Sequence, residues 1–216
     1  MNAGKSPVGV ILAGGLSSRM RGPEKTLLPL AEKPMIARIH ERLAKQVGQI
    51  VINANGDPAR FDFLPSPIMA DTLKDNPGPL AGVLAGMSWC ISNSPRTSHI
   101  LTVAGDTPFF PADLAERLTN AVSDIADPAI ALAYSDGNRH PTFGIWPVSL
   151  CESLNRFLDG GDRKVMLFAK DHNLQKVEFP MIGETSESID PFFNVNTPED
   201  FAKAETLIAE LERQSS

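Results

Sequence analysis

Short apolar runs alternate with longer amphipathic stretches along this chain, and this alternation limits the possible folds more than any other feature. The apolar runs have the length of buried strands and cover residues 8–12, 50–54, 67–71, 100–104, 129–134 and 142–146. Helical spacing of apolar residues marks the stretches 34–47, 80–91, 111–122, 149–158, 164–170 and a last helix that opens at Thr197. This order is typical of an α/β protein. We predict a three-layer sandwich in which helices cover both faces of a mostly parallel central sheet.

Length and composition fit one globular unit. Of the 216 residues, 42% are apolar and 21% charged, and no change in composition marks a linker. We expect a single domain over residues 1–216, with halves of about 8–125 and about 126–212. The net charge of −6 argues against a broad basic face for nucleic acid. The apolar stretch near the start is too short to cross a membrane, so we expect a cytoplasmic protein, and we expect a monomer.

Polar or glycine residues follow four of the predicted strands at the point where each strand ends. Gly14 and Gly15 follow the first strand, Asn53 ends the second, Asp71 the third, and Asp106 comes just after the fourth. Open α/β sheets bind ligands beyond the carboxyl ends of their parallel strands. These positions are therefore expected to gather along one edge of the sheet and to form a binding site there.

The segment after the first strand combines two adjacent glycines with an arginine and a lysine. Gly14 and Gly15 allow backbone N–H groups to approach a phosphate chain closely. Arg19 and Lys25 supply the positive charge that a triphosphate requires. The spacing is neither that of a P-loop nor that of a dinucleotide fingerprint. We interpret the segment as a triphosphate site; the alternative is an ordinary strand-to-helix turn with solvated cations.

Asp106 is the strongest single candidate after the glycine segment. It follows a buried strand and stands between Gly105 and Thr107-Pro108. Mg²⁺ binds through one or two carboxylates together with phosphate oxygens and waters, so a carboxylate placed here suits that ion. The alternative is that Asp106 caps the helix predicted to start at Pro111. Asp71, in a Pro/Gly-rich turn, and Asn53 have the corresponding alternative of ordinary turn residues.

Several segments together resemble a known family of nucleotidyltransferases with a Rossmann-like fold. One of these segments reads Leu-Ala-Gly-Gly-Leu-Ser-Ser-Arg-Met and is followed by a lysine. It is similar to the corresponding segment of molybdenum cofactor guanylyltransferases. Further similar segments are Gly-Pro-Leu-Ala-Gly at 78–82, Gly-Asp-Thr-Pro at 105–108, His-Pro-Thr-Phe at 140–143 and Asn-Val-Asn-Thr-Pro-Glu-Asp at 194–200. The resemblance covers nearly the whole chain.

The resemblance implies transfer of GMP from GTP to the terminal phosphate of molybdenum-loaded molybdopterin, with release of pyrophosphate. It implies that Mg²⁺ is held by Asp106 and that Lys25, Arg19 and Asp106 are catalytic. The residues that it implies for nucleotide binding are Leu12, Ala13, Gly14, Gly15, Lys25, Asn53, Asp71 and Asp106. Partners other than GTP and molybdopterin would be molybdenum insertion proteins and molybdoenzyme chaperones.

The second half of the chain would bind the pterin substrate if the resemblance holds. The residues that it points to are Arg163, Lys164, Asn194 and Asn196. Each has an ordinary alternative, since the two cations could be solvated charges at a helix start and the two asparagines could be turn or cap residues. The four histidines are scattered along the sequence, and we expect none of them to pair with a triad-like or metal-like partner.

Two other kinds of function remain open at this point. One is a related enzyme, either a molybdopterin cytidylyltransferase or a sugar-phosphate nucleotidyltransferase, because a few contacts decide which base is chosen. The other is a carrier that binds a nucleotide or cofactor without catalysis. Release of pyrophosphate distinguishes an enzyme from a carrier.

Overall fold

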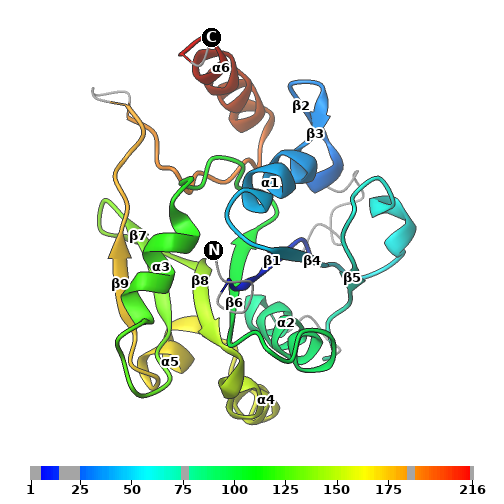
Figure 1. The fold of residues 1–216 in the computed structure, drawn as a ribbon. Coiled ribbons are helices and arrows are strands. Elements are labelled where there is room, and N and C mark those ends of the chain that lie inside the picture. Colours follow the sequence, from blue (N-terminus) through cyan, green and yellow to red (C-terminus); the bar gives the residue numbers. More distant parts are fainter. Residues whose placement is uncertain (1–5, 15–24, 74–77, 184–187, 215–216) are drawn as a thin grey trace.

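The computed structural model describes residues 6–14, 25–73, 78–183 and 188–214, and its centre is a seven-stranded sheet (Figure 1). The strands lie in the order β5-β4-β1-β6-β8-β7-β9. Their bounds are β1 Val8–Leu12, β4 Gln49–Asn53, β5 Ile68–Met69, β6 His99–Ala104, β7 Ala131–Ser135, β8 Asn138–Pro147 and β9 Gln175–Glu178. Four neighbouring strands, from β5 to β6, run parallel, and β9 runs parallel to β7. The predicted mostly parallel sheet is confirmed.

Strand β8 is the exception, because it runs antiparallel to both β6 and β7. Asp136 and Gly137 join β7 to β8, and both have positive φ, of 45° and 74°. A two-residue Asp-Gly connection with positive φ at both positions makes a tight hairpin, and a hairpin requires antiparallel strands. The Asp-Gly pair is thus a sequence signal for this reversal.

Helices cover both faces of the sheet, as predicted (Figure 1). Their bounds are α1 Met35–Ala44, α2 Pro79–Asn93, α3 Leu114–Val122, α4 Cys151–Asp159, α5 Val165–Lys170 and α6 Pro198–Gln214. Buried side chains of α1, α3 and α6 form one core with one face of the sheet, and those of α2, α4 and α5 form a second core with the other face. Alternate strand residues supply the two cores: Val10 packs with α2 and Ile11 with α1.

Short elements complete the described part of the chain. They are the 3₁₀ helices η2 Lys25–Leu27, η3 Pro58–Phe61 and η4 Val148–Leu150, and the hairpin of β2 Pro29–Leu30 with β3 Lys33–Pro34. Among the described helices, none is both long and apolar enough to cross a membrane.

Two differences between the predicted and the observed elements have a clear physical reason. Helix α3 begins at Leu114 rather than at Pro111, because residues 111–113 form a turn whose Pro111 carbonyl accepts from Leu114 N and from the Gln46 side chain. Strand β9 was not predicted, since its mixed polar pattern is that of an exposed edge strand. The predicted opening of the last helix is confirmed: Thr197 Oγ1 accepts from Asp200 N at 3.2 Å, and the Asp200 carboxylate accepts from Thr197 N at 2.9 Å.

Candidate active site

The end of β1 lies between the ends of its two neighbours, β4 and β6. Ala13 N donates to Asn53 O at 2.8 Å, and Gly105 N donates to Leu12 O at 2.9 Å. A Cβ atom at Gly105 would stand only 3.1 Å from Leu12 O, so glycine allows this close approach. The structure therefore brings Leu12, Ala13, Asn53 and the start of the Asp106 turn together. The predicted residues Gly15 and Arg19 lie outside the described residues.

A group of three polar residues occupies the β4 side of this edge; we call Asn53, Asn55 and Asp71 the amide–carboxylate group. Asn53 Nδ2 donates to Asp71 Oδ1 at 2.9 Å, and Asn55 Nδ2 donates to Asp71 Oδ2 at 2.8 Å. Asn55 Oδ1 in turn accepts from Asp71 N at 2.9 Å. Two amides thus fix the plane of one carboxylate. Asn55 was not among the predicted residues, although its position two residues after a predicted site residue could have suggested it.

Asn53 is buried, with 3% of its surface exposed, and helix α2 holds it in place. A Cβ atom at Gly82 would lie 2.4 Å from Asn53 Oδ1 and 2.5 Å from Leu12 Cδ2. Glycine therefore lets the first turns of α2 pack directly against the ends of β1 and β4. The same Asn53 oxygen lies 3.5 Å from the place of a Cβ at Gly14, so Asn53 also supports the start of the glycine segment.

A second group lies on the β6 side; we call Lys25, Asp106, Thr107, Asn194 and Asn196 the lysine–carboxylate group. Lys25 Nζ donates to Asn196 Oδ1 at 3.2 Å. The Thr107 hydroxyl donates to Asn194 Oδ1 and lies 3.3 Å from Asp106 Oδ1. These residues come from three distant parts of the chain, and the two predicted pterin-side asparagines meet the predicted catalytic residues here.

Burial raises the pKa of the Asp106 carboxyl above its ordinary value, while hydrogen bonding to Thr107 and the positive charge of Lys25 act in the opposite direction. Asp106 is half-buried, and its carbonyl oxygen accepts from Val195 N at 2.8 Å. The alternative of a helix cap is excluded, since Asp113 occupies the N-cap position of α3. A buried carboxylate with a raised pKa that lies near a lysine is a candidate for a functional residue.

The structure does not join Arg163 and Lys164 to either group. Arg163 donates to the carbonyl oxygens of Leu158 and Asp162, in the turn between α4 and α5. Lys164 occupies the N-cap position of α5 and is exposed. Within the described residues, no hydrogen bond or ion pair links these two cations to another predicted site residue.

Among the described histidines, His140 has both a serine and an aspartate as neighbours. His140 Nε2 lies 2.6 Å from Ser135 Oγ, which donates to Asp190 Oδ1 at 2.8 Å. His140 Nε2 also lies 3.6 Å from Asp190 Oδ2. Burial lowers the pKa of His140, and the negative charges of Asp190 and Glu178 oppose that change. Ser135 is 5 positions from His140 and 55 positions from Asp190, so the spacing in the sequence did not predict that the three residues meet.

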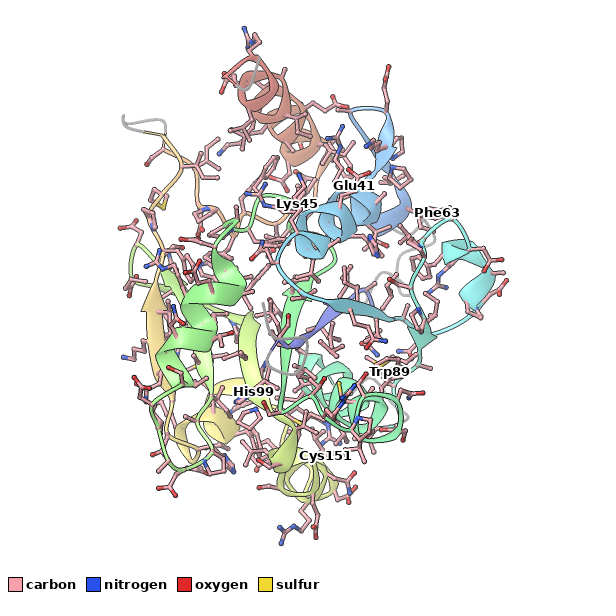
Figure 2. The ribbon with its side chains drawn as sticks, viewed as in Figure 1. Glu41, Lys45, Phe63, Trp89, His99 and Cys151 are labelled. Atoms are coloured by element: carbon pink, nitrogen blue, oxygen red, sulfur yellow. The ribbon has the colours of Figure 1, made fainter. Side chains whose placement is uncertain are left out.

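Other reactive side chains lie away from this edge. His99 begins β6, and Cys151 begins α4; both lie toward the end of the molecule opposite α6 (Figure 2). Burial lowers the pKa of His99, whose Nδ1 lies 2.9 Å from Ser98 Oγ. In the part of the chain that the structure describes, no three residues among His, Cys, Asp and Glu are grouped as metal ligands.

Known sequences match this chain over most of its length. The family model described as MobA-like NTP transferase domain matches residues 9–175. The molybdenum cofactor guanylyltransferase of Mesorhizobium japonicum is 43% identical over 201 residues, which cover 93% of this chain and 95% of that protein. The protein of the same name from Rhizobium meliloti is 44% identical over 207 residues, covering 95% and 94%.

Comparison with solved structures establishes the fold. Molybdopterin-guanine dinucleotide biosynthesis protein A from Archaeoglobus fulgidus matches with a TM-score of 0.69 and 22% identity, covering 94% of this chain and 99% of that one. Rv0371c from Mycobacterium tuberculosis, in complex with manganese, matches with a TM-score of 0.62 and 15% identity, covering 93% and 98%. The predicted α/β fold of the Rossmann-like kind is confirmed.

Proposed function

Since this chain belongs to the MobA-like NTP transferase family, we propose that it transfers GMP from GTP to molybdenum-loaded molybdopterin. The products are the guanine dinucleotide form of the cofactor and pyrophosphate. The observation that carries this proposal is the meeting of Lys25, Asp106 and Asn196 at the carboxyl edge of the parallel strands. An edge of this kind is where open α/β sheets bind ligands.

The amide–carboxylate group supports a guanine nucleotide as the donor substrate. Each oxygen of Asp71 accepts one amide hydrogen, from Asn53 or from Asn55, and keeps capacity for another. Guanine presents its N1–H and its 2-amino group side by side, and a fixed carboxylate can accept from both. We propose that Asp71 binds the base, and that the backbone of Leu12, Ala13, Gly14 and Gly15, together with Arg19, binds the triphosphate.

Transfer requires that a phosphate oxygen of the acceptor bond to the α-phosphorus while the bond from that phosphorus to the bridging oxygen breaks. The leaving group is pyrophosphate. A phosphate monoester has a second pKa of about 6, so the acceptor is largely a dianion at neutral pH and requires no general base. The task of the protein is to align two anions and to offset their repulsion. Lys25, oriented by Asn196, supplies positive charge for that purpose.

We propose that Asp106 holds a divalent cation, with Mg²⁺ as the expected ion. A single protein carboxylate suits a cation that is bound mainly by the substrate, because Mg²⁺ takes one or two carboxylates and completes its coordination shell with phosphate oxygens and waters. When bound, such an ion neutralises charge on the phosphates and on the leaving pyrophosphate. Asn194, which accepts from Thr107, and Asn196 are proposed contacts of the acceptor, and so are Arg163 and Lys164.

The test is a reaction of the purified protein with Mg²⁺, molybdenum-loaded molybdopterin and either GTP or CTP. Pyrophosphate and dinucleotide are measured together. We expect product from GTP and little from CTP. Product formed mainly from CTP would show that the protein is a cytidylyltransferase. Pyrophosphate formed only when a sugar phosphate replaces molybdopterin as the acceptor would show that it is a sugar-phosphate nucleotidyltransferase. Nucleotide binding without pyrophosphate from any acceptor would favour the carrier.

A further inference from the structure

The segment of residues 190–196 links the sheet to the candidate active site, and we call it the strap. In the sequence it comes after β9, and it leads to the start of α6 (Figure 1). The strap has no helix or strand of its own. It nevertheless delivers Asn194 to Thr107 and Asn196 to Lys25. The position of these two side chains depends on what holds the strap.

Asp190 anchors the first residue of the strap to the hairpin of β7 and β8. Asp190 Oδ1 accepts from Ser135 Oγ and, inside the strap, from Phe192 N, both at 2.8 Å. Ser135 is completely buried, and its Oγ lies 2.6 Å from His140 Nε2. Because the one hydroxyl proton is directed to the carboxylate, His140 Nε2 carries the hydrogen that is donated to Ser135.

This arrangement is not a catalytic triad. In a triad the histidine contacts the nucleophile through one ring nitrogen and the aspartate through the other. Here both Ser135 and Asp190 face the same nitrogen, Nε2. Ser135 is also inaccessible to a substrate. The three residues therefore form a junction that holds the backbone.

Packing and a backbone hydrogen bond hold the rest of the strap between this junction and the site. Phe192 stacks on the His140 ring, with 4.4 Å between ring centroids, and packs at 4.8 Å from Phe143. Val195 is completely buried, and its N–H donates to the Asp106 carbonyl oxygen at 2.8 Å. The exposed residues Asn194 and Asn196 stand on either side of Val195. Fixing both ends of so short a segment fixes both amides.

We propose that Asp190 is a positioning residue for nucleotidyl transfer: through Ser135 and Phe192 N it fixes the strap, and through the strap it places Asn194 and Asn196 beside the reacting groups. This inference rests on the proposed function. Asp190 contacts no substrate in this proposal. Its effect is on the geometry of the transfer step, and the GTP site on the β4 side of the edge, formed by other residues, does not depend on it.

The test compares Asp190→Ala with Asp190→Asn. Alanine removes the acceptor for Ser135 and Phe192 N, whereas asparagine keeps a carbonyl oxygen at that place. We expect kcat of the alanine variant to fall by about 10- to 100-fold, as for a small misplacement of reacting groups, with the KM for GTP close to that of the wild type. The asparagine variant should retain most of the wild-type turnover. Leu154→Val, in the core on the other face of the sheet, is the control for lost stability alone.

Hydrogen exchange gives a readout that does not depend on activity. In Asp190→Ala, amides of the strap, including that of Val195, should exchange faster, while those of residues 49–55 stay as in the wild type. Unchanged exchange in the strap would overturn the proposal. So would unchanged kcat in a wild-type enzyme that is active, or equal losses of kcat in the alanine and Leu154→Val variants at matched melting temperature. Absence of activity in the wild type would instead overturn the proposed function.

Discussion

The two polar groups at the edge of the sheet are built in opposite ways. In the amide–carboxylate group, Asp71 is bound to Asn53 and Asn55, which are 18 and 16 positions away in sequence. In the lysine–carboxylate group, the partners are 171 positions apart for Lys25 and Asn196. The first group surrounds one carboxylate with hydrogen bonds. The second brings a cation, a carboxylate and two exposed amides together with few bonds between them.

This difference indicates different tasks. A carboxylate whose two oxygens both accept from fixed amides is ready to bind one planar partner without rearrangement. Groups that leave much of their hydrogen-bonding capacity unused are ready to contact a ligand that arrives with its own charges. The amide–carboxylate group should therefore govern binding of the nucleotide, and the lysine–carboxylate group should govern the transfer step. The predictions below test this division.

The largest effect is expected from Asp106→Asn. This change removes the carboxylate proposed to hold the cation, and kcat should fall by about 10²- to 10³-fold. The thermal stability of this variant, in contrast, should be higher than that of the wild type. Burial raises the pKa of Asp106 in the folded state, so ionisation opposes folding, and wild-type stability should decrease as pH rises through that raised pKa. At neutral pH the variant should melt at a higher temperature than the wild type.

Turnover at saturating Mg²⁺ and thermal melting between acidic and neutral pH measure these two effects. The gain in melting temperature should shrink as the solution becomes acidic, where the wild-type carboxyl is neutral too. Asp113→Asn, at the exposed start of α3, is the matched control and should leave turnover unchanged. An Asp106→Asn variant that melts lower than the wild type at neutral pH would contradict the account of this carboxyl.

Lys25→Gln should have the next largest effect. Glutamine keeps a polar side chain beside Asn196 but removes the positive charge, so kcat should fall by about 10²-fold. Binding of GTP should weaken less, because other groups bind the base. Single-turnover and binding measurements separate the two quantities. Lys45→Gln is the control, since Lys45 lies exposed at the end of α1 (Figure 2). A loss confined to GTP affinity would refute the assignment of Lys25 to the transfer step.

Most of the site residues at the ends of the strands could be predicted from sequence, because the information that places them is local. The apolar runs placed the parallel strands, and the end of each strand placed Asn53, Asp71 and Asp106 at one edge. The strap was different. Its residues pair with groups far away in sequence, so resemblance pointed to Asn194 and Asn196, but no pattern predicted the junction at Asp190.

Gly82→Ala tests the packing beneath the amide–carboxylate group. The added Cβ would lie 2.4 Å from Asn53 Oδ1, so either α2 or Asn53 must move. Overpacking of this kind costs about 1–3 kcal/mol, of which better helix propensity recovers less than about 1 kcal/mol. The melting temperature should fall by a few degrees, and the KM for GTP should rise more than kcat falls. Calorimetry and steady-state kinetics measure these effects.

Gly48→Ala is the matched control for this glycine. The nearest atom to a Cβ at Gly48 would be Ser6 Oγ at 4.0 Å, so alanine fits without displacing a neighbour. This variant should keep both the wild-type melting temperature and the wild-type KM. If Gly82→Ala lowered kcat and left the KM for GTP unchanged, Asn53 and its neighbours would belong with the transfer step, and the division between the two groups would be wrong.

Asn55→Ala should have the smallest effect and is the most direct test of the amide–carboxylate group. It removes the donor to Asp71 Oδ2 and the acceptor for Asp71 N, but leaves the bond from Asn53 to Oδ1. Loss of such bonds at an exposed position costs about 0.5–1.5 kcal/mol, so the KM for GTP should rise by roughly 2- to 12-fold. Turnover at saturating GTP should stay at the wild-type level, because the lysine–carboxylate group is unchanged. Asn93→Ala, which removes a bond to Trp89 O at the end of α2, should alter neither quantity. A fall in kcat at saturating GTP would show that orientation of Asp71 matters for transfer as well as for binding.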